Sequence, residues 1–453
     1  MAQNTRTGDL TSGPMLQKII LFSLPLAASS ILQLLFNAAD VVVVGRFAGS
    51  TALAAVGSNG ALINLLVNLF VGLSLGANVV AARCFGAKDE RGVQNTVQTS
   101  VTLGLVSGVL LAFVGFFAAR GLLELMSCPE DVIGLSTLYL KIYFIGMPMT
   151  MLYNFSAALL RAVGDTRRPL YCLAVSGIIN VVLNLVFVIL FQMSVAGVAL
   201  ATIISQALSA VLVVIALMRR TDACKLYLSK MRFYKPQLEK ILRIGLPAGI
   251  QSALFSISNV LIQSSVNSFG DVFMSGNAAS SNIEGFVYVC LNAFQQSAVN
   301  FAGQNAGARQ YRRVRQTLWI CLGCVTVVGL VLGSLAYALG PSLLSIYITD
   351  SAEAISYGLI RLAFICLPYF LCGLMDVTTG ALRGIGASFV PMLISILGVC
   401  GLRIVWIYTI FQIPEFHTPQ CLYFSYTVSW IITFIAQLIA FFVVYRRQAS
   451  AAE

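Results

Sequence analysis

The chain has 453 residues, of which 58% are hydrophobic and only 10% are charged, and its mean hydropathy is +0.88. Soluble domains carry about 25% charged residues, so this composition excludes a water-soluble globular protein. The formal net charge of +11 fits basic loops beside a membrane, so it implies no nucleic-acid partner.

Apolar stretches of about 20 residues recur along the whole chain, which is long enough to cross a hydrocarbon core about 30 Å thick. The first 14 residues are polar and no apolar segment with a cleavage site follows them, so we expect no removable signal peptide. We predict an all-α integral membrane protein with twelve transmembrane helices. The predicted ranges are 17–44, 53–81, 94–119, 133–160, 169–191, 195–218, 240–268, 275–303, 316–339, 355–382, 389–411 and 421–445.

Lysine and arginine are distributed unevenly between the predicted loops. If the N-terminus is cytoplasmic, most of the 28 basic residues lie in the cytoplasmic segments, which is the positive-inside pattern. We therefore expect a multi-pass protein of the plasma (inner) membrane, with both termini cytoplasmic and with basic loops in contact with membrane lipid.

The two halves of the sequence match one another at an almost constant offset. The matching blocks are SLPLAASSILQLLFNAADV (23–41) with GLPAGIQSALFSISNVLIQ (245–263), GAKDERGVQNT (86–96) with GARQYRRVRQT (307–317), and LLRAVGDTRRP (159–169) with ALRGIGASFVP (381–391). Such an internal repeat indicates two parallel six-helix bundles with a central cleft. We predict an N-terminal bundle at 1–218, a cytoplasmic linker at 219–239 and a C-terminal bundle at 240–453.

These motifs resemble those of multidrug and toxic compound extrusion (MATE) transporters. The shared features are the early Leu-Pro, the later acid and Gly45, the RCFGAKD (83–89) and GQNAGAR (303–309) loops, and the paired LRAVGD (160–165) and LRGIG (382–386) motifs. The resemblance covers essentially the whole chain. It implies a secondary transporter, not an enzyme, that exports amphipathic, often cationic drug-like compounds by alternating access. It also implies that inward flow of protons or sodium ions drives export, without another cofactor. We expect a monomer, because both bundles lie in one chain.

Three acids lie well inside the predicted spans: Asp40, Glu284 and Asp376. An ionised carboxylate at that depth costs several kcal/mol, so such acids are the first candidates for cation coupling. Gln33, Asn37 and Asp40 follow i, i+4, i+7 spacing and share one helix face.

The resemblance places a cation site around Asp40, supported by the fifth helix, and we assign Asp40, Asn37, Asn180 and Asn184 to it. Many relatives carry an acid at the position of Asn184, whereas this chain has an amide. The site would then hold one formal charge, which favours a proton, although sodium at Asp40 remains open. A purely structural role for Asp40, hydrogen bonding within the bundle, is the alternative.

The second bundle offers Glu284, Asp376 and Arg403. Arg403 lies mid-membrane on the eleventh predicted helix and needs a counter-charge, for which Asp376 or Glu284 is the expected partner. Sequence leaves open whether these three residues couple transport or form a static charge network.

Polar and aromatic side chains on the predicted helix faces are candidates for lining a substrate cavity, since aromatic rings suit amphipathic cations. We select Gln33, Phe36, Asn259, Gln263 and Tyr288. The alternative function is a flippase for lipid-linked saccharides from the related superfamily. Such a site faces pyrophosphate and needs several cations, whereas Arg403 stands almost alone. The sequence does not identify the physiological substrate.

Overall fold

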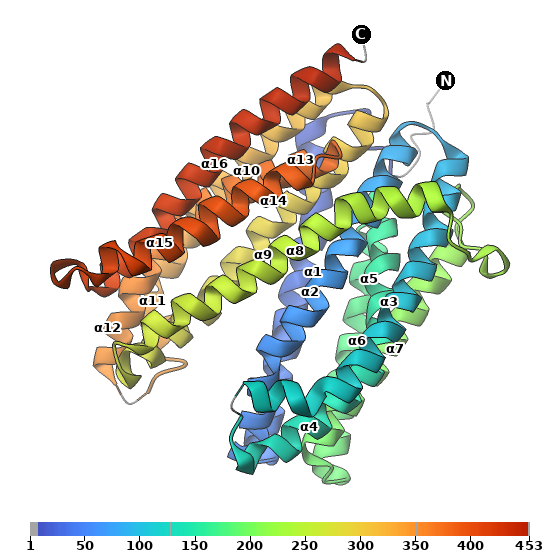
Figure 1. The fold of residues 1–453 in the computed structure, drawn as a ribbon. Helices are drawn as coiled ribbons and strands as arrows, with labels where there is room; N and C mark the ends of the chain where they lie inside the picture. The colour runs from blue at the N-terminus through green and yellow to red at the C-terminus, as the bar shows by residue number, and fades with distance from the viewer. Residues whose placement is uncertain (1–7, 127, 350, 452–453) are drawn as a thin grey trace. The chain divides into compact units, whose positions relative to one another are not determined.

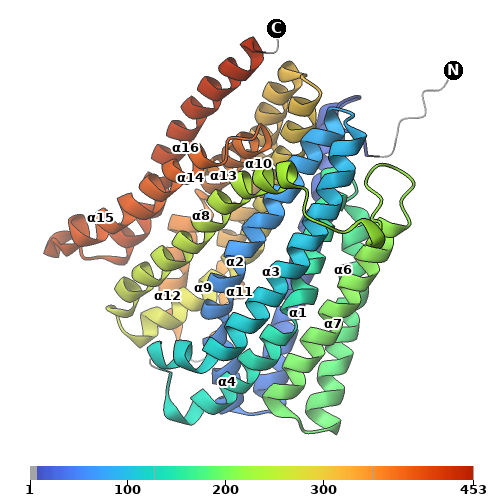
Figure 2. The same cartoon turned by 45° about the vertical axis from the view of Figure 1, so that its right-hand side comes forward.

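The computed structural model describes residues 8–126, 128–349 and 351–451. All regular secondary structure in these ranges is helical (Figure 1), which confirms the all-α prediction. The long helices and their loops can be followed from a second direction in Figure 2.

Helices of the first half begin with α1 (Met15–Phe47), α2 (Ser50–Gly86) and α3 (Glu90–Leu125). They continue with α4 (Glu130–Ile145), α5 (Met147–Ala162), α6 (Arg167–Leu185) with a π-helical extension η1 (Val186–Leu190), and α7 (Ser194–Met218). A short 3₁₀ turn η2 (Leu228–Lys230) lies in the connection to the second half.

The second half contains α8 (Lys235–Asn267), α9 (Asp271–Gly307), α10 (Tyr311–Ala338) and α11 (Gly340–Leu344). These are followed by α12 (Ala352–Arg361) with the π-helical η3 (Leu362–Cys366), α13 (Tyr369–Gly384), and α14 (Phe389–Ser395), which runs through the π-helical η4 (Ile396–Gly401) into α15 (Leu402–Tyr408). Two 3₁₀ turns, η5 (Ile410–Gln412) and η6 (Pro414–Phe416), lead to α16 (Pro419–Ser450).

Nine helices in the described ranges are long and apolar enough to cross a membrane, or up to eleven if two bent pairs each count as one span. The bends are 48° between α4 and α5, and 41° between the α12–η3 helix and α13. They fall at Gly146 and Leu367–Pro368, which are equivalent positions of the repeat.

The one remaining predicted span, 275–303, is α9, which lacks a stretch as apolar as those of the other spans. Its amides Asn277, Asn300, Gln304 and Asn305 are buried. Amides and hydroxyls in membrane helices commonly hydrogen-bond to neighbouring helices instead of facing lipid. The polar side chains of α9 are therefore compatible with a position inside the bundle.

The chain divides into two compact units whose borders differ from the predicted domains. The first unit comprises residues 28–249 and the short stretch that ends at Asp9, and the second comprises residues 10–27 and 250–453. The predicted borders at 218 and 240 follow the loops, whereas the observed borders fall inside α1 and α8. The start of each half's first helix therefore belongs to the other unit.

Specific contacts hold the beginning of α1 in the second unit. The backbone N–H of Leu10 donates to Gln304 Oε1 at 3.0 Å, and the hydroxyls of Ser23 and Ser297 lie 2.6 Å apart. The rings of Phe22 and Phe301 meet edge to face, with centroids 5.6 Å apart. All of these contacts are made with α9, so the beginning of α1 packs against α9.

Glycines hold the beginning of α8 in the first unit. Gly72 and Gly76 on α2, and Gly245 and Gly249 on α8, are each spaced by four residues. A Cβ on Gly72 would collide with the Gly249 backbone, and one on Gly76 with the backbones of Ile241 and Gly245. This small-residue spacing lets two helix backbones approach closely, which explains why α8 starts against α2.

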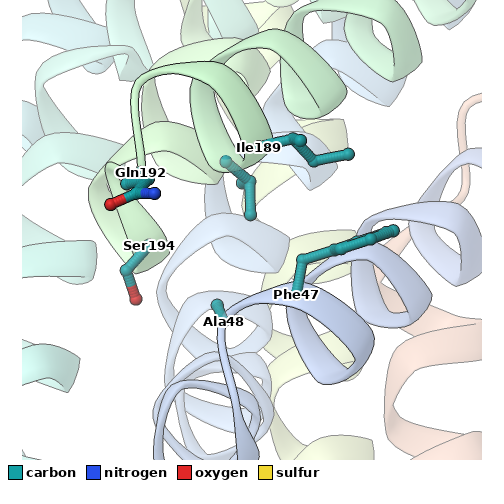
Figure 3. A pocket seen from close by; sticks show the side chains of 6 residues that line it. Phe47, Ala48, Ile189, Gln192 and Ser194 are labelled. Atoms are coloured by element: carbon teal, nitrogen blue, oxygen red, sulfur yellow. The ribbon is translucent and has the colours of Figure 1, made fainter.

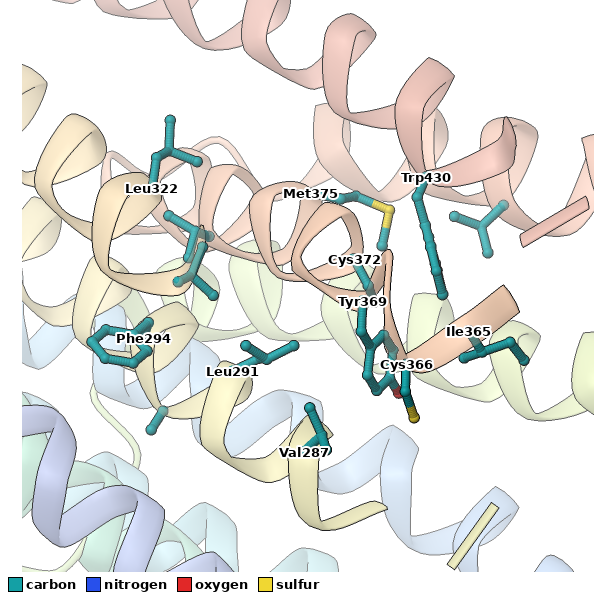
Figure 4. Close-up of a cluster of buried hydrophobic side chains, with 14 of the residues drawn as sticks. Val287, Leu291, Phe294, Leu322, Ile365, Cys366, Tyr369, Cys372, Met375 and Trp430 are labelled. Carbon is teal, nitrogen blue, oxygen red and sulfur yellow. The ribbon is translucent and has the colours of Figure 1, made fainter. Parts of the chain in front are cut away.

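Each unit has its own apolar core. In the second unit, Figure 4 shows Val287 and Leu291 of α9 directed toward Tyr369, Cys372 and neighbouring side chains of α13 and α16. The first unit has three smaller clusters. The polar residues considered below lie among these apolar side chains.

Candidate functional site

Asp40 and two amides of the fifth predicted helix, observed as α6, come together in the first unit. Asn184 Nδ2 on α6 donates to Asp40 Oδ1 on α1 and also lies 3.3 Å from Asn180 Oδ1. Asn180 and Asn184 are buried, and Asp40 is half-buried. We refer to these three residues as the Asp40 cluster.

Helix geometry explains the arrangement. Asn180 and Asn184 are one turn apart, so their side chains leave the same face of α6. Two residues after Asn184, the α-helix widens into the π-helical η1, a feature often found at functional sites. Asn184 Oδ1 is buried and has no hydrogen-bond partner among the described residues, so the cluster retains one unused acceptor.

The surroundings of Asp40 are aromatic on the side of α4. Tyr139 interacts electrostatically with Asp40 and stacks on Tyr143, with ring centroids 6.0 Å apart. Phe36 packs on α6, where its ring occupies the space that a Cβ on Gly177 would need. The Asp40 carboxylate thus lies between amide groups and rings, with no arginine or lysine as an ion-pair partner in the described ranges.

Asn37 and Gln33, the other polar residues on this face of α1, are exposed. Asn37 takes no part in the hydrogen bonds of the Asp40 cluster found in the described structure. The predicted four-residue site is therefore observed as three residues in contact, with Asn37 beside them.

A separate cavity of about 330 Å³ opens at the end of α1 (Figure 3). It is lined by Phe47, Ala48, Val188, Ile189, Gln192 and Ser194. None of the residues selected as substrate-cavity candidates lines it, so this cavity gives no support to those candidates.

Glu284 forms the central ion pair of the second unit, but not with the predicted arginine. Arg361 Nη2 lies 2.6 Å from Glu284 Oε2, and Tyr369 donates its hydroxyl to Glu284 Oε1 at 3.1 Å. Arg361 Nη1 also donates to Asn277 Oδ1 at 2.7 Å, which accepts a second hydrogen bond from the Tyr423 hydroxyl at 2.8 Å.

Arg361, Asn277, Tyr369 and Tyr423 are functional candidates that the sequence interpretation missed. Arg361 is the last residue of α12, directly before the π-helical η3. The only signal was its position directly before an unbroken apolar run, LAFICL (362–367). A buried arginine must find a partner in such a run, and the fold supplies Glu284 from α9.

Arg403 lacks the carboxylate partner that was predicted. It is 4% exposed, donates from Nε to Ser429 Oγ at 2.9 Å, and lies 3.9 Å from the Tyr426 ring centroid and 5.7 Å from that of Trp430. The prediction of an Arg403 ion pair with Asp376 or Glu284 is therefore wrong for the described structure. Aromatic rings of α16 stabilise the guanidinium, because ring faces attract cations.

Asp376 is buried on α13 and makes no hydrogen bond or ion pair with other described residues. It interacts electrostatically with Arg383 and with Tyr288. Arg383 instead donates from Nη2 to Gln251 Oε1 at 2.9 Å. Arg383 follows Asp376 by seven residues on α13, and these two helical turns separate the side chains too far for a direct pair.

The remaining substrate candidates of the second unit lie at its surface. Asn259 and Gln263 are exposed, and Gln263 bonds locally to Asn267 Oδ1 at 2.9 Å. Tyr288 is 37% exposed and stacks on Tyr369, with ring centroids 6.2 Å apart. The exposed Tyr288 ring therefore contacts Tyr369, which in turn hydrogen-bonds to Glu284.

No group of three or more His, Cys, Asp or Glu side chains in the described part of the chain could hold a metal ion. The Asp40 cluster offers one carboxylate and two amides, and one amide directs its nitrogen at that carboxylate.

Comparison with known proteins identifies the class of protein. The model of the MatE family matches residues 25–186 and 247–409, that is, one segment in each half, with starts 222 residues apart. The chain therefore belongs to the MatE family, and it is a membrane transporter rather than an enzyme.

Particular relatives extend over nearly the whole chain. It is 30% identical over 392 residues to the "Probable multidrug resistance protein YoeA" of Bacillus subtilis (strain 168), covering 85% of this chain and 84% of that protein. It is 21% identical over 380 residues to the "Multidrug export protein MepA" of Staphylococcus aureus (strain NCTC 8325), covering 84% and 81%.

Solved structures share the fold at lower identity. A MATE structure in complex with MaL6 matches with a TM-score of 0.90 at 20% identity, covering 99% of both chains. An outward-facing multidrug resistance MATE family transporter of the MOP superfamily also gives 0.90, at 21% identity and with the same coverage. The predicted twelve-helix transporter fold is thereby confirmed.

Proposed function

We propose that this transporter exports amphipathic, often cationic drug-like compounds by cation-coupled antiport, with the proton as the coupling ion. The observation that carries the proposal is the Asp40 cluster: a membrane carboxylate that faces amides rather than a cationic partner. Such a carboxylate can gain or lose a proton without breaking an ion pair. Two relatives, named as a probable multidrug resistance protein and a multidrug export protein, support the substrate class.

In the proposed cycle, Asp40 takes up a proton from outside, and the loss of its charge changes the packing of α1 against α6. Bound substrate is released on that change, and alternating access between the two bundles completes the cycle. The protein would work as a monomer in the plasma (inner) membrane, with both termini in the cytoplasm. The basic connections between helices support that orientation.

Asp40→Asn is expected to abolish gradient-driven efflux, because the amide keeps the shape of the side chain but cannot exchange a proton. The measurement is export of a cationic dye from proteoliposomes under an imposed pH gradient or sodium gradient. The matched control is Asp131→Asn, which removes an exposed acid at the start of α4 and should transport normally.

The two gradients separate the possible coupling ions. Transport driven by pH and lost only in Asp40→Asn supports the proposal. Normal pH-driven transport by that variant would remove Asp40 from the mechanism, and sodium-driven transport by the wild type would replace the proton as the coupling ion.

A further inference from the structure

The connection between the two halves, residues 219–240, is fixed to the first unit and is not a loose tether. Cys224 and Leu226 are buried in one of its apolar cores. Gln94 Nε2 donates to the Lys225 carbonyl at 3.1 Å, and the Tyr234 N–H donates to Thr99 Oγ1 at 3.1 Å. The backbone of the segment thus lies on the start of α3.

This fixed segment exposes large apolar side chains. Leu228 is 56% exposed, Phe233 is 44% exposed and Tyr227 is 36% exposed. Exposing apolar surface to water is unfavourable, and a fixed backbone cannot withdraw these side chains into the core. A surface that covers them would therefore be favoured.

Basic side chains surround the same positions. Residues 219–240 contain seven Lys or Arg and two acids, and both acids are paired: Asp222 with Arg220 at 2.5 Å and Glu239 with Lys235 at 4.0 Å. Among the basic residues without an acidic partner, Lys230 and Arg232 are exposed and Lys225 is half-buried.

Three of these cations lie over aromatic rings and have no ion-pair partner within the described ranges. Lys225 and Lys230 place Nζ 5.3 Å and 4.8 Å from the Tyr227 ring centroid, and the Arg232 guanidinium lies 4.5 Å from that of Tyr234. Cations and apolar tips thus alternate on one surface, which we call the linker surface: Lys225, Tyr227, Leu228, Lys230, Arg232 and Phe233.

We propose that the linker surface binds anionic phospholipids of the adjacent membrane leaflet. Leu228 and Phe233 enter the boundary between headgroups and acyl chains, while the lysines and Arg232 contact the lipid phosphates. An apolar and a basic signal together give stable membrane attachment where either alone is weak, and each basic residue near an anionic surface strengthens the attachment. The short η2 turn, Leu228–Lys230, presents both signals at once.

The test is lipid binding to the purified full-length protein, measured by native mass spectrometry during titration with phosphatidylglycerol or phosphatidylcholine. The charge variant combines Lys230→Gln with Arg232→Gln. The apolar variant combines Leu228→Ser with Phe233→Ser. The control combines Lys88→Gln with Arg91→Gln, which removes two exposed charges from the turn after α2 and from the first turn of α3. Thermal midpoints in detergent establish that all variants fold.

We expect the charge variant to lose affinity for phosphatidylglycerol by about tenfold or more, with phosphatidylcholine binding unchanged, and the control to match the wild type. The apolar variant should bind both lipids more weakly. The proposal is overturned if the charge variant binds phosphatidylglycerol normally, or if the control weakens it equally. It is also overturned if millimolar glycerol phosphate displaces the lipid, because the surface would then recognise phosphate without a membrane.

Discussion

At the scale of single residues, the three membrane acids have three different surroundings. Asp40 accepts from an amide, Glu284 is paired with Arg361, and Asp376 is buried among neutral groups, with Arg383 further away. Charge on Glu284 can disappear only if a buried ion pair breaks, whereas charge on Asp40 has no such constraint. This difference is the physical reason why we propose Asp40 as the residue that couples proton flow to transport.

A second carboxylate beside Asp40 should change the response to cations. In Asn184→Asp, the donor to Asp40 becomes another acid, and two close carboxylates repel one another unless a cation lies between them. We expect export by this variant to become dependent on a sodium gradient. Dye efflux under separate pH and sodium gradients measures the change.

The control for this prediction is Asn154→Asp, which adds a carboxylate on α5, where Asn154 donates to the Thr150 carbonyl. It should give no sodium dependence. A sodium response in both variants would mean that added negative charge, not its location beside Asp40, causes the effect.

Removing only one partner of the Glu284–Arg361 pair should strongly lower the stability of the protein. Arg361→Met leaves Glu284 buried without its partner, which typically costs about 3–5 kcal/mol. The double variant with Glu284→Gln removes both charges and should recover most of that loss. Unfolding midpoints of the purified variants measure both changes, and a stable single variant would show that Tyr369 alone suffices for Glu284.

At the scale of elements, departures from regular α-helix occur beside buried polar groups. Asn184 lies just before η1, Arg361 directly precedes η3, and Arg403 follows η4. A π-helical turn inserts a residue and re-aims the side chains next to it. Sequence periodicity assumes a constant 3.6-residue turn, so it could not predict the partners of Arg361 and Arg403.

The glycine contact of α2 and α8 gives a prediction at this scale. Gly72→Ala should destabilise the protein by about 1–3 kcal/mol, because the new methyl group must displace the α8 backbone. Gly121→Ala on α3 is the matched control: its Cβ would meet no atom within 4 Å, and alanine should be neutral or improve the helix by up to about 1 kcal/mol. Thermal unfolding in detergent compares the two, and equal midpoints would exclude close packing as the role of Gly72.

At the scale of the whole molecule, the repeat and the compact units do not coincide. Residues 10–27 belong to the second unit and residues up to 249 belong to the first. Neither half of the sequence therefore contains all the helical segments of one compact unit.

This exchange predicts how a divided chain behaves. Co-expressed fragments 1–233 and 234–453 should purify together through a tag on one of them, because each supplies a helix start that packs within the other unit. A fragment expressed alone should be unstable in detergent. Stable, well-folded single fragments would show that the exchanged helix starts are dispensable.

The sequence by itself determined the class of fold, the twelve spans and the internal repeat. Hydropathy and repeated motifs are properties of the local sequence and do not depend on how the helices pack. Helical spacing aligned the two amides Asn180 and Asn184, the family resemblance grouped them with Asp40, and the structure shows the three side chains in contact. Tertiary structure alone decided that Glu284 pairs with Arg361, that aromatic rings surround Arg403, and that α1 and α8 start in exchanged units. Those outcomes depend on how helices that are distant in the sequence pack together. Helix crossing angles, π-helical turns and glycine contacts decide which side chains come within a few ångströms of one another. No pattern along the chain contains that information.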